Sequence, residues 1–366
     1  MRLKVAREPL RDAFQVAASI ASQRTTKPVL QNVKVEASEG ALVLSGTDLE
    51  VAVRLSLAEG VEILEEGCIL LPATRVAGIL RESPGEQLEI QTVENACQIR
   101  GKHSVFKVLV EDPEQFPELP AMETEGALAV DAASLKAMVR KTAFATARES
   151  TRYALNGILF VISNHTLELA ATDGRRLAVA SLDLEASRAT LPQAIVPVKA
   201  LTELERLPTK EEESVLVKLE ETQVFFKTER GLISSRLVEG QFPPHKEVIP
   251  KDLNKKVTVG RVDLLSAVRQ AALLTTEEAK AVRLNLSPGK LTVSSKTPES
   301  GEAEVNLDVE YDGGALEIGF NPDFLVDVLR VVEEERIQFE ASEPTRPALI
   351  RAGKDYLYVV MPLTLL

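Results

Sequence analysis

The sequence predicts an α+β protein made of three tandem copies of one domain, each with antiparallel strands and two amphipathic helices. Short landmark sequences recur about every 125 residues along the 366-residue chain. Each interval holds two helical patterns and several strand patterns. The composition is that of globular domains, because 45% of the residues are hydrophobic and 27% are charged.

Each copy begins with a short alternating strand that leads into a helix. The three starts are Leu3-Lys4-Val5, Leu128-Ala129-Val130 and Val257-Thr258-Val259, at intervals of 125 and 129 residues. The stretches that follow have apolar residues spaced three and four apart, which predicts amphipathic helices. These predicted helices include residues 9–20, 135–144 and 264–273.

Landmarks further along each copy keep the same spacing. Gly46-Thr47-Asp48 lies 125 residues before Ala171-Thr172-Asp173, and Gln115-Phe116-Pro117 lies 126 residues before Gln241-Phe242-Pro243. A second helix in each copy follows Leu71-Pro72, Val196-Pro197 or Phe320-Asn321-Pro322. These predicted helices cover residues 76–81, 201–207 and 324–332. Repetition at several landmarks favours a true internal repeat over chance similarity.

The remaining segments alternate between apolar and polar residues, which predicts half-buried antiparallel strands joined by short turns such as Glu39-Gly40 and Asn164-His165. In the first copy the predicted strands cover residues 33–35, 42–44, 51–57, 88–92 and 105–110. Residues 111–126 and 239–256 are rich in Pro, Glu and Lys, so we interpret them as linkers. The predicted domains are residues 1–121, 122–250 and 251–366.

The chain lacks the patterns of a membrane, secreted or metal protein. No apolar run reaches the roughly 18 residues that span a bilayer, and the amphipathic start is unlike a secretory signal, so we expect a cytoplasmic protein. Cys68 and Cys97 lie in separate strand patterns and the three histidines are scattered. We therefore predict strand cysteines, no metal site and no cofactor.

A catalytic role is not favoured. Asp48 and Asp173 could form a carboxylate pair, but their recurrence in separate copies favours a shared turn closed by the aspartate side chain. The sequence has no phosphate-binding G-x-x-x-x-G-K-[ST] loop, no G-x-S-x-G and no H-E-x-x-H. We predict that the protein is not an enzyme and has no catalytic residues.

Charge is distributed unevenly along the chain. The net charge is −12, yet residues 134–152 carry a net +4 and the six helical segments together carry +3. Two helices on one face of each sheet would line the inside of an arc, and complementary sheet edges could close two chains head to tail into a ring. A weakly basic lining would suit DNA phosphates. Charged helix faces that are merely solvated explain the same pattern.

Several motifs resemble the bacterial DNA polymerase III β subunit, the sliding clamp family. They are Arg152-Tyr153-Ala154-Leu155-Asn156-Gly157, Ala171–Ala178, Gly46–Glu50, Gly319-Phe320-Asn321 and Tyr358–Leu363, in order over nearly the whole chain. The resemblance implies three DNA-clamp domains per chain, with sheets outside and two helices per domain inside. It also implies a homodimeric head-to-tail ring around double-stranded DNA, bound without regard to sequence, that confers processivity on the polymerase.

The resemblance further implies a hydrophobic groove between the second and third domains. This groove would bind short peptide motifs of the replicative polymerase, the clamp loader and repair proteins. The matching positions are Leu155, Thr172, Gly174, Arg175, Arg176, Leu177, Pro243, Val248, Asn321, Phe324, Val359, Val360, Met361, Pro362 and Leu363. Without the resemblance, residues 359–363 would be interpreted as a terminal core strand.

The positions that the resemblance assigns to DNA contact are Arg24, Arg75, Arg152, Tyr153 and Lys199. Charge adds Lys141 and Arg148 to this set. The alternative hypothesis is a repeat scaffold that binds only proteins and does not enclose DNA.

Overall fold

The computed structural model describes residues 1–21, 25–147, 153–163, 165–184, 193–210, 212–276 and 280–364. The chain divides into two compact units. Unit 1 contains Met1–Lys136 and Lys199–Leu237, and unit 2 contains Ala137–Val198 and Val238–Leu366. The predicted central domain is thus divided between the two units.

The six helices described are those that the sequence predicts. They are α1 (Arg7–Ile20), α2 (Ala73–Glu82), α3 (Ala132–Ala143), α4 (Val198–Arg206), α5 (Arg261–Ala272) and α6 (Pro322–Val331). The structure also has short 3-10 helices, namely η1 (Pro28–Gln31), η2 (Pro113–Gln115), η3 (Tyr153–Leu155) and η4 (His245–Glu247). The amphipathic spacing of each long helix places its apolar residues on one face.

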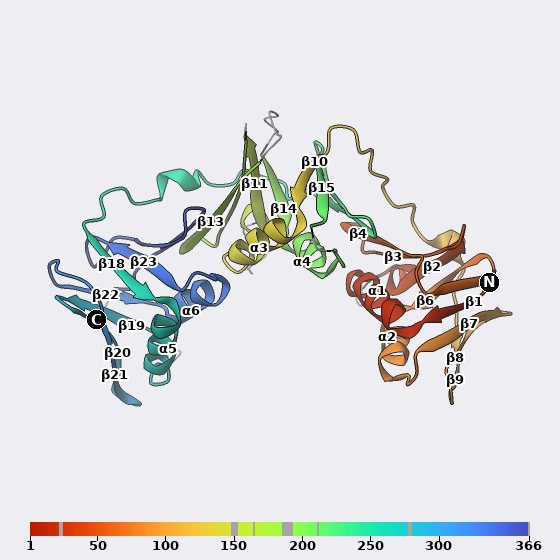
Figure 1. Ribbon diagram of the computed structural model, residues 1–366, viewed down its shortest axis with the longest axis horizontal. Coiled ribbons are helices and arrows are strands. Elements are labelled where there is room, and N and C mark those ends of the chain that lie inside the picture. The colour runs from red at the N-terminus through yellow and green to blue at the C-terminus, as the bar shows by residue number, and fades with distance from the viewer. Residues whose placement is uncertain are drawn as a thin grey trace. The chain divides into compact units, whose positions relative to one another are not determined.

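Unit 1 holds an eight-stranded sheet in the order β10-β15-β16-β17-β4-β3-β2-β6 and a five-stranded sheet in the order β5-β1-β7-β8-β9. The strands are β1 (Arg2–Ala6), β2 (Asn32–Ser38), β3 (Ala41–Thr47), β4 (Val51–Leu57), β5 (Val61–Glu65), β6 (Gly67–Pro72), β7 (Gln87–Val93), β8 (Ala96–Arg100), β9 (Val105–Leu109), β10 (Leu128–Asp131), β15 (Ser214–Leu219), β16 (Gln223–Lys227) and β17 (Gly231–Arg236). Helices α1 and α2 lie side by side, and α1 packs on β3 and β4 (Figure 1).

Unit 2 holds an eight-stranded sheet in the order β14-β11-β12-β13-β25-β24-β23-β18 and a four-stranded sheet in the order β21-β20-β19-β22. The strands are β11 (Gly157–Ser163), β12 (Thr166–Thr172), β13 (Arg176–Asp183), β14 (Ala194–Pro197), β18 (Lys255–Gly260), β19 (Val282–Ser287), β20 (Lys290–Thr297), β21 (Gly301–Asp308), β22 (Leu316–Phe320), β23 (Arg336–Ala341), β24 (Ala348–Ala352) and β25 (Tyr356–Val360). Helix α5 packs against α6 and on β20 and β21.

The strand pairing in both units is antiparallel, as the alternating sequence pattern predicts. Each eight-stranded sheet joins strands from two predicted domains, because β17 pairs with β4 in unit 1 and β13 pairs with β25 in unit 2. This pairing explains why the chain forms two compact units. The boundaries near 121 and 250 stay a prediction.

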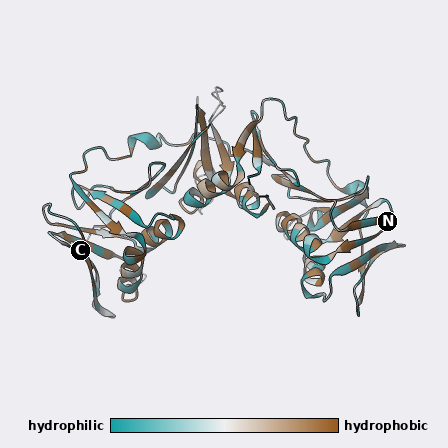
Figure 2. Cartoon of the chain, viewed as in Figure 1, coloured by the Kyte–Doolittle hydropathy of each residue, from teal (hydrophilic) through white to brown (hydrophobic). Residues whose placement is uncertain are grey.

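Hydrophobic and hydrophilic residues both occur along the strands and helices (Figure 2). Cys97 is fully buried in β8, and its burial raises the pKa of the thiol to about 12. Cys68 lies partly buried in β6, where burial also raises its pKa. Both cysteines are therefore strand residues with poorly nucleophilic thiols. No helix within the described residues is long and apolar enough to cross a membrane.

Candidate functional site

A tight turn between β12 and β13 organises the predicted groove residues. Oδ1 of Asp173 accepts the N–H groups of Arg175 at 2.9 Å and Arg176 at 3.1 Å. The Thr172 hydroxyl donates to the Arg176 carbonyl at 2.6 Å and accepts the N–H of Gly174 at 3.1 Å. Gly174 has a φ of +88°, which glycine adopts without a steric penalty. The aspartate therefore closes a turn, as predicted.

Arg176 is the most strongly held side chain of this region, with 7% exposure. Its Nε donates to Asp173 Oδ2 at 3.0 Å, and its Nη1 donates to Asp327 Oδ2 at 2.7 Å. Nη2 donates to the Phe144 carbonyl at 2.7 Å. The guanidinium also lies 5.3 Å from the ring centre of Phe144 and 4.6 Å from that of Phe324, within range of a cation–π contact.

The groups around Arg176 favour the ionised form of its guanidinium. Burial alone lowers the pKa of Arg176, but Tyr358, Asp327 and Asp173 outweigh burial and leave the pKa above its ordinary value. Tyr358 is buried, which raises the pKa of its hydroxyl, and it donates to the Phe324 carbonyl at 2.9 Å. The cation thus connects the turn to Phe144, just after α3, and to α6 as a fixed positive group.

A pocket of about 540 Å³ lies beside this cation. Among the predicted groove residues, it is lined by Gly174, Arg175, Arg176, Asn321 and Phe324. Its other lining residues, which the sequence reasoning did not select, are Thr146, Ala147, Asp173, Asp323 and Asp327. The internal repeat is a sequence signal that could have identified Asp327. Asp327 of α6 lies 124 residues after Glu203 of α4, so the two acidic residues occupy corresponding turns of these helices.

Asn321 and Thr172 were expected to offer polar groups to a bound peptide. In the structure, Asn321 caps α6 by accepting the N–H of Asp323 at 3.0 Å. Both hydrogen bonds of the Thr172 hydroxyl lie within its own turn. These side chains therefore first satisfy backbone groups at a helix start and a turn.

The chain end passes beside the turn. Met361 donates its N–H to the Arg175 carbonyl at 2.9 Å, and Leu363 donates its N–H to the Gly319 carbonyl at 2.8 Å. The side chains of Met361 and Leu363 are 44% and 39% exposed, and Val248 is 55% exposed. Exposed apolar side chains close together in the chain, as Met361 and Leu363 are, are typical of a binding surface.

Other predicted groove residues lie in the core beneath this surface. Leu177, Val359 and Val360 are at most 3% exposed, and Leu155 is 8% exposed. Leu177 and Val359 belong to a cluster with Leu159, and β13 pairs with β25 so that Leu177 faces Val359. The interpretation of 359–363 as a core strand therefore applies to Val359 and Val360, whereas Met361 begins the exposed segment. Pro243 is exposed.

The predicted DNA contacts occupy different settings. Arg24, Arg148 and Arg152 lie outside the described residues, and Tyr153 begins η3. Arg75 is exposed in the first turns of α2. These positions stay predictions.

The two predicted lysine contacts are engaged in ion pairs within their own units. Lys141 at the end of α3 is paired with Glu334 at 3.3 Å, and its side chain is 19% exposed. Lys199 at the start of α4 is paired with Asp48 at 2.5 Å and is 44% exposed. Each lysine charge is therefore partly compensated before any DNA binds.

Within the described residues, no cluster of His, Cys, Asp or Glu is suited to hold a metal ion. Oδ1 of Asp48 accepts the N–H groups of Glu50 at 3.0 Å and Val51 at 2.8 Å. The structure therefore confirms the turn interpretation for Asp48 and for Asp173.

Comparison with known proteins places this geometry in one family over almost the whole chain. The models of the DNA polymerase III beta subunit match residues 1–120 as the N-terminal domain, 129–244 as the central domain and 246–364 as the C-terminal domain. The beta sliding clamp of Pseudomonas aeruginosa is 35% identical over 372 residues, covering 100% of both chains. That of Chlamydia muridarum is 31% identical, covering 100% of this chain and 99% of the relative.

Solved structures agree with the sequence comparison. The sliding clamp of Pseudomonas aeruginosa bound to griselimycin has a TM-score of 0.92 at 34% identity, with complete coverage of both chains. The DNA polymerase sliding clamp of Bacillus subtilis has a TM-score of 0.92 at 28% identity, again with complete coverage.

Proposed function

Because this chain belongs to the DNA polymerase III beta subunit family and is a DNA sliding clamp, we propose that two copies close head to tail around duplex DNA and hold polymerases through short peptides. The observation that carries this proposal is the match of three successive family domains, in order, to residues 1–120, 129–244 and 246–364. A dimeric ring is known for this family, and the family is a processivity factor rather than a catalytic subunit. The comparisons do not favour a protein-only scaffold.

The two outer sheet edges support head-to-tail assembly. Strand β9 ends the five-stranded sheet of unit 1, and its Val105 and Leu109 are 64% and 72% exposed. Strand β21 ends the four-stranded sheet of unit 2. Exposed Lys107 lies on the first edge, and exposed Glu304 and Asp308 lie on the second. We infer that β9 of one copy pairs with β21 of the other, because open edges of opposite charge attract one another.

The peptide groove would lie along the turn after β12 and the segment that follows β25. Exposed Met361 and Leu363 would contact aliphatic and aromatic anchors of the peptide. The fixed cation of Arg176 would contact its polar groups, since three of its five N–H donors have the partners described above. Polymerases, the clamp loader and repair proteins are the proposed partners, and the cytoplasm is the proposed location.

Enclosure rather than affinity would keep the protein on DNA. DNA contacts through Arg24, Arg75, Lys141, Arg148, Arg152, Tyr153 and Lys199 would then be individually weak and independent of sequence. A polymerase tethered to the ring gains a high effective concentration at the primer end.

Retention on circular and linear DNA tests this proposal. The protein is loaded with a clamp loader and ATP onto a nicked circular duplex, and the complex is isolated by gel filtration at moderate salt. We expect the protein to stay on the circle, to leave after a restriction enzyme opens it, and to stay when bulky proteins block the new ends. Equal loss from circular and linear DNA would overturn the proposal.

A further inference from the structure

Unit 1 repeats the backbone of the candidate groove of unit 2. Asp48 accepts two N–H groups, as described above, and the Thr47 hydroxyl donates to the Val51 carbonyl at 2.9 Å and accepts the N–H of Leu49 at 3.0 Å. The N–H of Arg236 donates to the Glu50 carbonyl at 2.9 Å. The same five hydrogen bonds recur 125 residues later in unit 2, where Met361 is the last donor.

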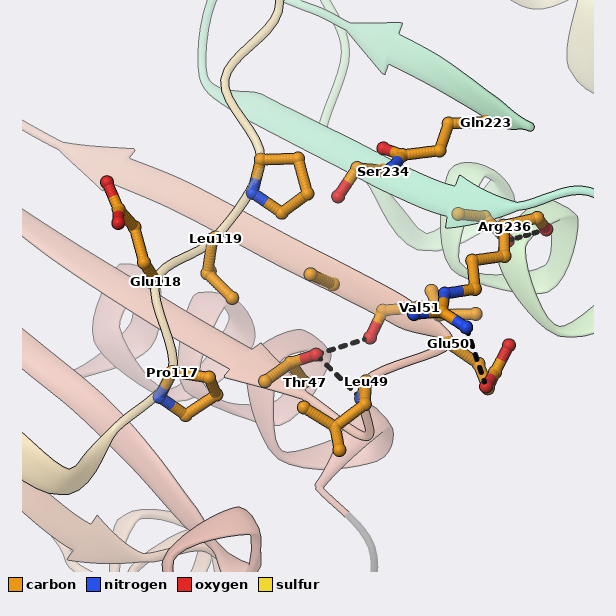
Figure 3. Close-up of a pocket in the computed structure, with 13 residues that line it drawn as sticks. Thr47, Leu49, Glu50, Val51, Pro117, Glu118, Leu119, Gln223, Ser234 and Arg236 are labelled. Atoms are coloured by element: carbon orange, nitrogen blue, oxygen red, sulfur yellow. Dashed lines mark hydrogen bonds and ion pairs between the residues drawn. The ribbon is translucent and has the colours of Figure 1, made fainter. Parts of the chain in front are cut away.

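A pocket of about 270 Å³ lies beside this repeated turn (Figure 3). Several of its lining residues lie 125 residues before predicted groove residues of unit 2. They are Thr47, Leu49, Glu50, Val51, Ala52, Ser234, Ser235 and Arg236. Strand register gives the same correspondence, because Ala52 faces Ser234 in unit 1 as Leu177 faces Val359 in unit 2.

The chemistry of the unit 1 pocket differs from that of the groove. Ser234, Ser235 and Arg236 stand where unit 2 has Val359, Val360 and Met361. Ser234 is 4% exposed, and no hydrogen bond from its hydroxyl is found among the described residues. The floor of the pocket therefore offers a hydroxyl to a ligand rather than a purely apolar surface.

Leu49 gives this pocket an apolar wall that the turn does not require. It has a φ of +77°, whereas its counterpart Gly174 closes the same turn at +88°. A bulky residue is rare at positive φ, and such strain gathers at ligand sites. The Leu49 side chain is also 43% exposed. Neither the strain nor the exposure helps folding, and both are consistent with a contact between Leu49 and a ligand in the pocket.

The linker supplies an unpaired backbone. Residues 117–120 line the pocket, and within the described part of the chain their backbone makes no hydrogen bond. Figure 3 shows Leu119 directed from this linker toward the pocket. Pro117 and Pro120 have no N–H, so Glu118 and Leu119 supply the free N–H groups and all four residues supply C=O groups that can pair with an extended peptide.

The rim of the pocket is acidic on balance. Glu50 and Glu118 are exposed, and Arg236 forms an ion pair with Glu50 at 3.9 Å. Both side chains of this pair are 65% exposed, so it is weak, and no ion pair of Glu118 is found among the described residues. The two carboxylates can therefore accept a basic group. The pocket volume is slightly below the range of small-molecule sites, which limits the ligand to one side chain and the adjoining backbone.

We propose that unit 1 carries a second peptide-binding pocket, which takes an extended peptide with one aliphatic side chain next to a basic residue. The choice of a peptide rests on the groove proposed for unit 2, whereas the preference for a basic neighbour rests on the rim of unit 1. The two sites therefore differ in ligand, and one peptide chemistry does not serve both.

Methyl NMR of the full chain tests this proposal at both sites at once. The probe is acetyl-Gly-Leu-Lys-Gly-amide, and the reporters are methyl groups of Val51, Ala52 and Leu119. Methyl groups of Val360 and Met361 report on unit 2 in the same spectra, where a peptide with Gln, Leu and Phe anchors is titrated separately. We expect the unit 1 signals to shift to saturation with the lysine probe, and at least fivefold weaker binding when Glu replaces the lysine.

Two variants make the test specific. Leu49→Gly removes the wall and suits the positive φ, so the fold should survive while the affinity of the lysine probe falls at least tenfold. Leu64→Ala, also at a 43% exposed leucine of unit 1, should leave the affinity unchanged. If Leu49→Gly shifts methyl signals outside the pocket, which would indicate a change in the fold, Leu119→Ala replaces it. The affinity of the lysine probe is then expected to fall in Leu119→Ala.

The absence of saturable shifts at Val51, Ala52 and Leu119 would overturn the second pocket, as would an affinity of Leu49→Gly equal to that of the Leu64→Ala control. Failure of the groove proposed for unit 2 is seen separately, as an absence of shifts at Val360 and Met361 with the second peptide.

Discussion

Nη1 of Arg176 donates a hydrogen bond to Asp327 Oδ2 at 2.7 Å, and this ion pair ties the turn after β12 to helix α6. The pair joins positions 151 residues apart in the sequence. The Arg176 side chain is 7% exposed and that of Asp327 is 30% exposed. Solvent therefore screens the interaction weakly on the arginine side, and the loss of the aspartate would leave a buried donor without a partner.

We expect Asp327→Ala to lower the stability of unit 2 by about 1–3 kcal/mol, because one N–H of a buried guanidinium loses its acceptor. Urea unfolding followed by circular dichroism measures this change. Asp323→Ala is the control, since Asp323 pairs with Lys280 at the surface and should cost less than about 1 kcal/mol. Equal effects of the two substitutions would contradict the structural role of Arg176.

We expect the double variant Met361→Ala, Leu363→Ala to bind client peptides with at least tenfold lower affinity. Its unfolding midpoint should change little. Both side chains are more than a third exposed, so their loss removes binding surface rather than core packing. Fluorescence anisotropy with a peptide carrying Gln, Leu and Phe anchors measures the affinity. An unchanged affinity would mean that the groove lies elsewhere.

The proposed pairing of β9 with β21 predicts a charge-reversal pattern. Lys107→Glu alone and Glu304→Lys alone should each weaken the dimer, because each places like charges on facing edges. The double variant should recover much of the lost affinity. Analytical ultracentrifugation measures the dimer dissociation constant. If the loss of dimerisation free energy in the double variant equals the sum of the losses in the two single variants, the result would argue against this pairing.

Arg75 and Lys141 should differ in their contribution to DNA binding. For Arg75, no ion pair is found among the described residues, so Arg75→Ala should reduce the slope of log affinity against log salt by about one. Lys141→Ala should reduce the slope by clearly less, because Glu334 already compensates its charge. Titration of a labelled duplex over a range of salt concentrations gives both slopes. Equal reductions would show that the Lys141–Glu334 pair opens on DNA.

Glu168 should make the protein sensitive to acid. A hydrogen bond with His245, at 3.0 Å, is the main reason that the pKa of Glu168 lies below its ordinary value of 4.5, and Lys246 at 3.2 Å adds to the effect. A lowered pKa in the folded state stabilises the protein above pH 4.5, and this stabilisation is lost as the pH falls through the lowered pKa.

Glu168→Gln should therefore be less stable than the parent protein near neutral pH, and the difference should shrink as the pH falls below about 4. Denaturant unfolding at a series of pH values measures the difference. Glu229→Gln, which removes an exposed carboxylate paired with Lys210, is the control and should show little change at any pH. A difference for Glu168→Gln that does not depend on pH would contradict this assignment.

The sequence by itself determined the local structure and the family. The apolar spacing of three and four predicted the helices described, and alternation predicted antiparallel strands, because these patterns follow from backbone geometry alone. The repeat also identified the Asp48 and Asp173 turns, since their hydrogen bonds lie within five residues of sequence. Motifs carried the family resemblance because they preserve the same turns and strand ends.

Only the tertiary structure decided which residues act together at the site. The partners of Arg176 come from Phe144 just after α3, from α6 and from its own turn, and no local pattern relates positions so far apart. The pairing of β4 with β17 and of β13 with β25 likewise depends on long-range contacts, which divide the predicted central domain between two units. The tertiary structure also decided that Val359 and Val360 are buried whereas Met361 is exposed. The burial of a side chain depends on which distant parts of the chain pack against it.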